Sequence, residues 1–272
     1  MARKLEEDLT EETAPKKRGA RSPSKLPVLK VAAYSLLAFV ALGSGLYGMH
    51  VTERFFILDT RFALNGGEES EQTLAVAGTS YASVPALRSV FHDDLGKSIY
   101  LLPLEERRTR LRTVDWVKEA SVARLWPNRV MVRVWERTPV AFLPIENSSY
   151  ALIDEDGVIL PTVSGRFRLP VLHGVKTSAP QADRKERVKS MLRLTQELGV
   201  ASKDLSEIDV SDKDNLKVMQ PYERRELTLM LGDHNFAARY KNFIQHFSEI
   251  RRRLPDAVTL DLRLEDRITV VE

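Results

Sequence analysis

The chain has 272 residues, of which 43% are hydrophobic and 29% charged, and it contains no cysteine, so a disulfide framework and thiol chemistry are excluded. Its formal net charge of +3 comes from residues 1–30, which hold eight Lys/Arg and five acidic residues, because the remaining chain has 33 of each. Nucleic-acid binding needs a concentrated basic surface, which such a balanced chain does not predict.

Residues 1–30 form a polar tail with the composition of a disordered segment. The five acids all precede Thr13, and six cations follow it up to Lys30. The next 22 residues, Val31 to Thr52, carry no charged side chain. As a helix they would extend about 33 Å, enough for a bilayer core of about 30 Å. The positive-inside rule keeps the tail in the cytoplasm and exports the rest of the chain.

A cleaved signal peptide is the alternative for this apolar segment. Its h-region would be about 7–15 residues long, whereas the run here is longer and continues past the small residues at 41–45. We therefore expect an uncleaved anchor and a single-pass type II membrane protein. The expected divisions are a cytoplasmic tail (1–30), a transmembrane helix (31–52) and two exported domains (53–143 and 144–272).

The first exported domain has a mixed α and β pattern. Its clearest signal is strict alternation, which places Val130, Val132 and Val134 on one strand face and Met131, Arg133 and Trp135 on the other. The expected elements are a strand at 73–76, a helix from Ser83 to Phe91 with Ser83 as its cap, a helix beginning at Pro103, and strands at 117–125 and 130–135.

The second exported domain is predicted to be a largely antiparallel sheet covered by two helices. Asp183 and Glu186 have the spacing of a capping box for a helix ending before Gly199. An aromatic stripe predicts a second helix over 236–254, with its apolar face in the core. The expected strands are 205–210, 216–220, 226–231 and 258–271, the last with an interruption. The fold class is thus α+β.

No catalytic, cofactor or metal constellation is expected. The five histidines are scattered, and Asp154-x-Asp156-Gly157 lacks the acidic twelfth position of a calcium loop, so it predicts a turn. The only Ser-x-x-Lys motif, beginning at Ser22, lies in the tail. These patterns indicate a protein that is not an enzyme.

Four motifs follow one another along the exported part. They are Val114-Asp115-Trp116-Val117 with Arg124-Leu125-Trp126-Pro127 and Glu136-Arg137-Thr138-Pro139-Val140-Ala141; the turn 152–158; Leu169-Pro170-Val171-Leu172-His173-Gly174; and Thr259-Leu260-Asp261-Leu262-Arg263. Together with the anchor, this order resembles the FtsQ/DivIB family of bacterial cell-division proteins. The resemblance implies a POTRA domain followed by a β-domain. Ala63–Gln72 departs from the family pattern and is expected to be an insertion near the first POTRA strand.

The resemblance also implies a non-enzymatic scaffold of the division machinery in the inner membrane at the septum, which links early to late division proteins and helps control septal peptidoglycan synthesis. FtsB-like and FtsL-like proteins are the implied partners, with FtsK-like and FtsW/FtsI-like proteins as further candidates. The segment 262–270 is the candidate edge strand, where β-augmentation would bind the partner. From composition alone, the favoured interpretation is that the charged residues of this segment protect an exposed edge strand against aggregation. The implied contact residues are Arg263, Leu264, Glu265, Asp266, Arg267 and Ile268, with Arg224 and Arg225.

Two other functions stay open at this point. A POTRA-containing component of a protein transport or secretion assembly would carry a β-barrel or tandem modules, and no series of alternating membrane strands follows here. A membrane-anchored hydrolase with an unrecognised site would be detected by assaying the exported part on cell-wall polymers.

Overall fold

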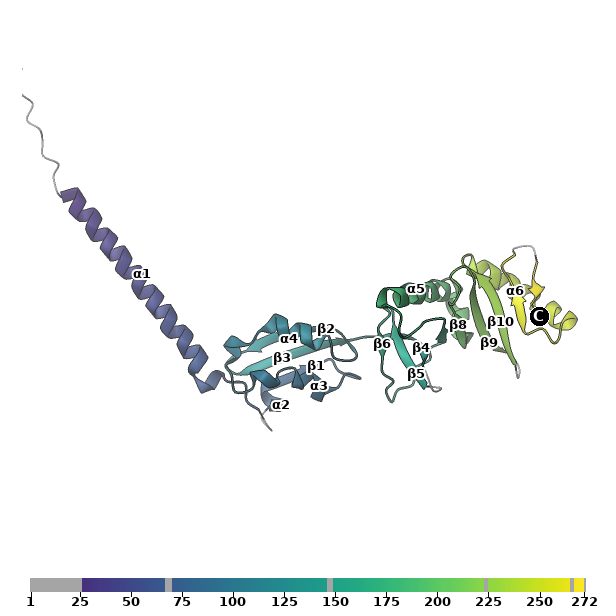
Figure 1. Ribbon diagram of the computed structural model, residues 1–272, viewed down its shortest axis with the longest axis horizontal. Helices are drawn as coiled ribbons and strands as arrows, with labels where there is room; N and C mark the ends of the chain where they lie inside the picture. The colour runs from purple at the N-terminus through teal and green to yellow at the C-terminus, as the bar shows by residue number, and fades with distance from the viewer. Residues whose placement is uncertain (1–25, 67–69, 146–148, 223–224, 265–266, 272) are drawn as a thin grey trace, which may run out of the picture. The chain divides into compact units, whose positions relative to one another are not determined.

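The computed structural model of the protein describes residues 26–66, 70–145, 149–222, 225–264 and 267–271. The chain divides into two compact units, 1–58 and 59–272. In the first unit, α1 (Leu26–Leu58) contains the expected span from Val31 to Thr52 (Figure 1). It is the one described helix that is long and apolar enough to cross a membrane, and none of its most apolar window is buried. This exposure suits a helix surrounded by lipid.

The second unit begins with a three-stranded sheet in the order β1-β3-β2. β1 is parallel to β3, and β2 and β3 form an antiparallel hairpin. The predicted order of strand, helix, helix, strand and strand is confirmed. The elements are η1 (Thr60–Phe62), α2 (Ser70–Thr73), β1 (Leu74–Ala77), α3 (Val84–Ser89), η3 (His92–Asp94), η4 (Ile99–Leu101), α4 (Leu104–Leu111), β2 (Val117–Leu125) and β3 (Arg129–Glu136).

Local signals of the sequence determine this module. The Ser83 side chain caps α3 by accepting a hydrogen bond from the Ala86 N–H, as predicted. The three valines of β3 are buried, whereas Trp135 on the opposite face is 48% exposed. The segment expected to be an insertion is partly integrated, because Leu64 lies in the core and Ala63 forms a β-bridge with Ser98.

A nine-stranded sheet follows, in the order β12-β11-β10-β9-β8-β7-β4-β5-β6. The pairs β4–β7, β7–β8 and β10–β11 are parallel and the other five are antiparallel, so the sheet is mainly antiparallel as expected. Its elements are β4 (Pro139–Ile145), β5 (Ser149–Asp154), β6 (Ile159–Leu160), β7 (Val171–His173), α5 (Gln181–Leu198), η5 (Gly199–Asp204), β8 (Glu207–Asp209), β9 (Leu216–Tyr222), β10 (Arg225–Gly232), α6 (Phe236–Arg253), β11 (Thr259–Asp261) and β12 (Thr269–Val270).

The two helices α5 and α6 cover one face of this sheet (Figure 1). The aromatic stripe of α6 is mostly core as predicted, since Phe236, Tyr240 and Phe243 are buried. Leu254 is an exception, because the helix ends at Arg253 and leaves it 47% exposed. On the opposite face, Leu152 and Leu160 pack into the core of the first module. The expected domain boundary after residue 143 falls within β4.

The start of α5 differs from the prediction. The helix begins at Gln181 after Pro180, and Asp183 lies in its first turn rather than at a cap. A tertiary contact takes the place of the capping box: the Gln181 side chain donates to the Asp156 carbonyl (3.1 Å), and Lys185 pairs with the Asp156 carboxylate (2.8 Å). The capping-box prediction is therefore wrong.

Two adjacent residues at the end of β3 join separate parts of the second unit. One carboxylate oxygen of Glu136 accepts hydrogen bonds from the backbone N–H groups of residues 80, 81 and 82, at 2.7–2.8 Å. Arg137 donates to the Val117 carbonyl and pairs with Asp154 at 2.6 Å. Asp154 is 1% exposed and also accepts from the N–H groups of Asp156 and Val158. The predicted turn after Asp154 is confirmed, and it is fixed to the first module. We call Glu136, Arg137 and Asp154 the junction.

Candidate partner-docking site

The C-terminal end of the larger sheet is an exposed edge. β11 pairs in parallel with β10, and β12 pairs antiparallel with β11 and ends the strand order. Both residues of β12 are exposed. The strand expected over 258–271 is interrupted, as predicted: the chain leaves the sheet after Leu262, whose N–H still donates to the Met230 carbonyl, and pairs again at Thr269. Of the candidate edge strand 262–270, only Thr269 and Val270 are described as strand.

A turn formed by Asp261 and Arg263 causes this departure. The Arg263 guanidinium binds both carboxylate oxygens of Asp261 at 2.6–3.0 Å, and the Arg263 N–H donates to the same carboxylate at 2.9 Å. These hydrogen bonds from Arg263 hold the pKa of Asp261 below its usual value, and those to Asp261 raise the pKa of Arg263. Arg263 is therefore engaged within the chain, and its first role is structural.

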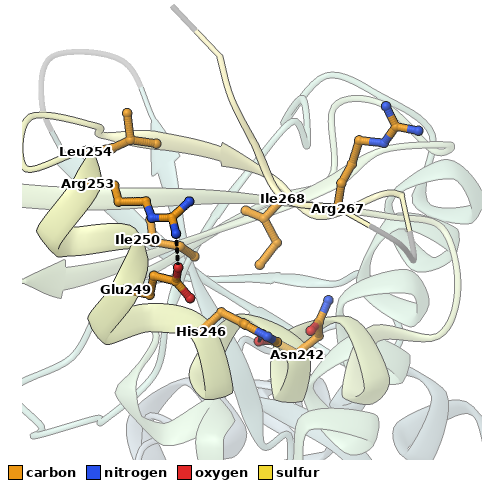
Figure 2. Close-up of a pocket in the computed structure, with 8 residues that line it drawn as sticks. All are labelled: Asn242, His246, Glu249, Ile250, Arg253, Leu254, Arg267 and Ile268. Atoms are coloured by element: carbon orange, nitrogen blue, oxygen red, sulfur yellow. Dashed lines mark hydrogen bonds and ion pairs between the residues drawn. The ribbon is translucent and has the colours of Figure 1, made fainter.

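Two residues of the predicted site, Arg267 and Ile268, line a groove of about 310 Å³ between α6 and the segment before β12 (Figure 2). Ile268 is directed toward the helix and packs against the core, and Arg267 extends away from the helix. Leu264 is 48% exposed and lies outside the groove lining. The groove is lined by Asn242, His246, Glu249, Ile250, Arg253, Leu254, Arg267 and Ile268.

Arg225 lies away from these residues. It begins β10, whereas Arg263 approaches Gly232 at the other end of that strand. Arg225 forms an exposed ion pair with Asp256 at 3.2 Å. The structure thus brings Arg267 and Ile268 together and leaves Arg225 apart from them. Arg224, Glu265 and Asp266 lie outside the described residues.

The α6 side of the groove was missed by the sequence prediction. The prediction treated α6 only as a source of core residues, but the helix supplies five of the eight lining side chains, and Leu254 directly after its end supplies a sixth. Glu249 and Arg253 on this face form an ion pair at 2.5 Å (Figure 2). The available signal was the polar pattern of residues 242–253, since the two positions of this pair lie four apart on one helix face.

The exposed edge has the geometry of main-chain pairing. A short exposed edge strand presents unpaired N–H and C=O groups that can accept a strand of another chain. Among residues 26–271, apart from the undescribed segments, no group of three or more His, Asp and Glu could hold a metal ion.

Two family models match the chain. The family model described as POTRA domain, FtsQ-type, matches residues 71–137, and that described as Cell division protein FtsQ/DivIB, C-terminal, matches residues 141–263. The second match ends at Arg263, before β12.

Relatives in several bacteria carry the name Cell division protein FtsQ. That of Koribacter versatilis (strain Ellin345) is 32% identical over 95% of this chain and 75% of the relative. The Rickettsia felis protein is 33% identical over 32% of each chain, and the Syntrophotalea carbinolica protein is 24% identical over 64% of each. With a POTRA module, a β-rich module and an apolar N-terminal helix in this order, the chain belongs to the FtsQ/DivIB family of cell-division proteins.

Proposed function

We propose that this protein is a non-enzymatic, membrane-anchored scaffold of the division machinery. α1 crosses the inner membrane once in type II orientation, and the bulk of the protein lies in the periplasm at the septum. Its β12 edge docks an FtsB-like protein together with its FtsL-like partner, and the assembly helps to control septal peptidoglycan synthesis. The observation that carries this proposal is the exposed edge at β12.

Strand addition at this edge has a defined geometry. The Val271 N–H donates to the Thr259 carbonyl, so this pair is hydrogen-bonded toward β11. Antiparallel pairs alternate, and the register pairs Val270 with Leu260. The N–H and C=O of Val270 therefore point away from β11, toward an added strand.

The groove supports the same proposal because it lies beside the edge. Its apolar side chains, Ile250, Leu254 and Ile268, are flanked by charged Arg253 and Arg267. A partner segment that continues from the added strand as an amphipathic helix could bury its apolar face there.

A second docking surface is available for FtsK-like or FtsW/FtsI-like proteins. The strand face of Met131, Arg133 and Trp135 has exposed Arg133 and half-exposed Trp135. A protein confined to the membrane that holds one partner at each surface raises the effective concentration of one partner for the other.

The test replaces Val270 by proline and, as a control, by alanine. Proline removes the outward N–H while leaving the pairing of Thr269 and Val271 with β11, and proline is tolerated where the missing N–H faces solvent. We expect Val270→Pro to abolish co-purification of the FtsB-like partner with the full-length protein, and Val270→Ala to keep it.

Thermal unfolding of both variants is the control for folding. If Val270→Pro melts like the wild type and still co-purifies the partner at the wild-type level, strand addition at β12 is wrong.

A further inference from the structure

An exposed apolar patch lies at the tip of the β2–β3 hairpin. Trp126 is 52% exposed, Leu101 51%, Leu125 43% and Tyr100 40%. With Phe62, we call these residues the hairpin-tip patch. Large apolar side chains gathered on one surface indicate contact with a partner or a membrane.

Three separate segments build the hairpin-tip patch, and direct contacts hold them together. The Phe62 ring meets the Trp126 ring edge-on, with centroids 5.5 Å apart. The Arg124 guanidinium donates to the Leu102 carbonyl at 2.6 Å, which fixes the hairpin to η4. The bridge between Ala63 and Ser98 joins η1 to the start of η4. The patch is therefore a fixed feature of the module.

The chain tethers this patch close to the bilayer surface. The uncharged run of α1 ends at Thr52, and the six residues to Leu58 add about 9 Å along the helix axis. Phe62 follows Leu58 by four residues, which extend at most about 14 Å however the two units are placed. A surface with so short a tether meets the headgroup layer at high effective concentration.

The residues have the chemistry of a membrane interface. Tryptophan and tyrosine are enriched at headgroup level, and basic side chains are attracted to anionic lipids. Exposed Lys97 and Arg129 lie at the rim, since Lys97 accepts a hydrogen bond from Leu64 and Arg129 pairs with Leu125. Arg61 is also exposed and is paired with Asp59.

We propose that the hairpin-tip patch inserts into the headgroup layer of the outer face of the membrane that α1 crosses. This contact gives the first module a second, peripheral attachment and limits its tilt. The tether favours lipid over a protein occupant, because the lipid is always within reach of the patch.

Tryptophan fluorescence tests this proposal directly, because the chain has three tryptophans and none lies in α1. Trp116 is 2% exposed, and Trp135 lies at the other end of β3 with 48% exposure, similar to Trp126. Full-length protein is reconstituted in phosphatidylethanolamine/phosphatidylglycerol vesicles containing lipid brominated on the upper acyl chain. We expect partial quenching of the wild type, loss of that quenching in Trp126→Phe, and no such loss in Trp135→Phe.

A second variant shows whether the loss of quenching in Trp126→Phe comes from the missing tryptophan or from misfolding. Adding Leu101→Trp to Trp126→Phe should restore quenching, because residue 101 belongs to the same patch. Equal emission of the wild type with and without brominated lipid, or unchanged quenching in Trp126→Phe, would overturn the proposal. Shielding of Trp126 from acrylamide only when other division proteins are added would assign the patch to a protein and equally overturn it.

Discussion

The junction and the β12 edge are two polar regions of the same unit with opposite character. At the junction, Asp154 is 1% exposed and its carboxylate accepts hydrogen bonds from one side chain and two backbone N–H groups. At the edge, β12 consists of two exposed residues paired on one side. Buried and satisfied polar groups fix a geometry, whereas an exposed strand edge is free to exchange water for a partner.

The difference indicates how a scaffold can separate rigidity from binding. Arg137 connects the first module to the turn that supports α5, and Glu136 beside it holds residues 80–82 within the first module. The edge contributes little to that arrangement and can change its contacts. Substitutions at the junction should therefore lower the free energy of unfolding, and substitutions at the edge should lower partner binding.

The largest expected effect is that of Asp154→Ala. It leaves Arg137 without its carboxylate and two backbone N–H groups without their acceptor, so we expect the free energy of unfolding to fall by about 3 kcal/mol. Urea denaturation of the full-length protein in detergent micelles measures this change in the free energy of unfolding. Asp156→Ala is the control, since its carboxylate pairs with half-exposed Lys185 and should change stability less. An unaltered urea midpoint for Asp154→Ala would show that the junction does not stabilise the unit.

Glu136→Gln should have a smaller effect. The substitution keeps an oxygen acceptor but removes the charge that strengthens three hydrogen bonds, so we expect a loss of about 1–2 kcal/mol. Amide hydrogen exchange should become faster at residues 80–82 in particular. If exchange at these three amides stays as in the wild type, their bonds to Glu136 do not form in solution.

Much of this architecture was predictable from local patterns. The Ser83 cap, the alternating valines of β3 and the stop at Gly199 each depend on neighbours in sequence, and each was predicted correctly. The start of α5 was not predictable, because Asp156, 25 residues before Gln181, satisfies its first turn.

The candidate site was predicted less well than the fold. The segment 262–270 was expected to be the edge strand, but the Asp261–Arg263 pair bends the chain out of the sheet after Leu262. The groove depends on which face of α6 meets the segment before β12, and periodicity gives only the buried face. Arg225 was grouped with Arg263 by resemblance, although the two lie at opposite ends of β10.

The pH dependence of the Asp261–Arg263 pair gives a third prediction. Because the pKa of Asp261 is lowered in the folded state, its contribution to stability is complete above the unfolded pKa of about 3.9 and is lost as the pH falls through the folded pKa. Arg263→Gln should lower stability at pH 7 and have little effect at the lowest pH. Arg263 is nearly half exposed, so solvent screening keeps the difference below about 1 kcal/mol.

Thermal unfolding of the wild type and Arg263→Gln between pH 2 and pH 7 measures this difference. If the difference in melting temperature between the two proteins stays constant over that range, the charge of Asp261 does not contribute to stability through Arg263.

The smallest effect on stability is expected for Leu254→Ala. Leu254 is 47% exposed, so its truncation should change the free energy of unfolding by less than about 0.5 kcal/mol. If a partner covers it in the groove, loss of the buried apolar area should weaken partner binding about 5–10-fold. Ile244→Ala is the matched control, because Ile244, on α6, is similarly exposed (52%) but does not line the groove. Equal partner affinities of the two variants in a titration would remove the groove from the docking site.

Amide hydrogen exchange of the full-length protein, with and without the FtsB-like partner, tests docking at the β12 edge most directly. We expect slower exchange at Val270 and along the groove side of α6 when the partner is bound, with unchanged exchange at the junction residues 136–137 and 154. Protection confined to the first module, with residues 267–271 exchanging as fast as in the free protein, would contradict it.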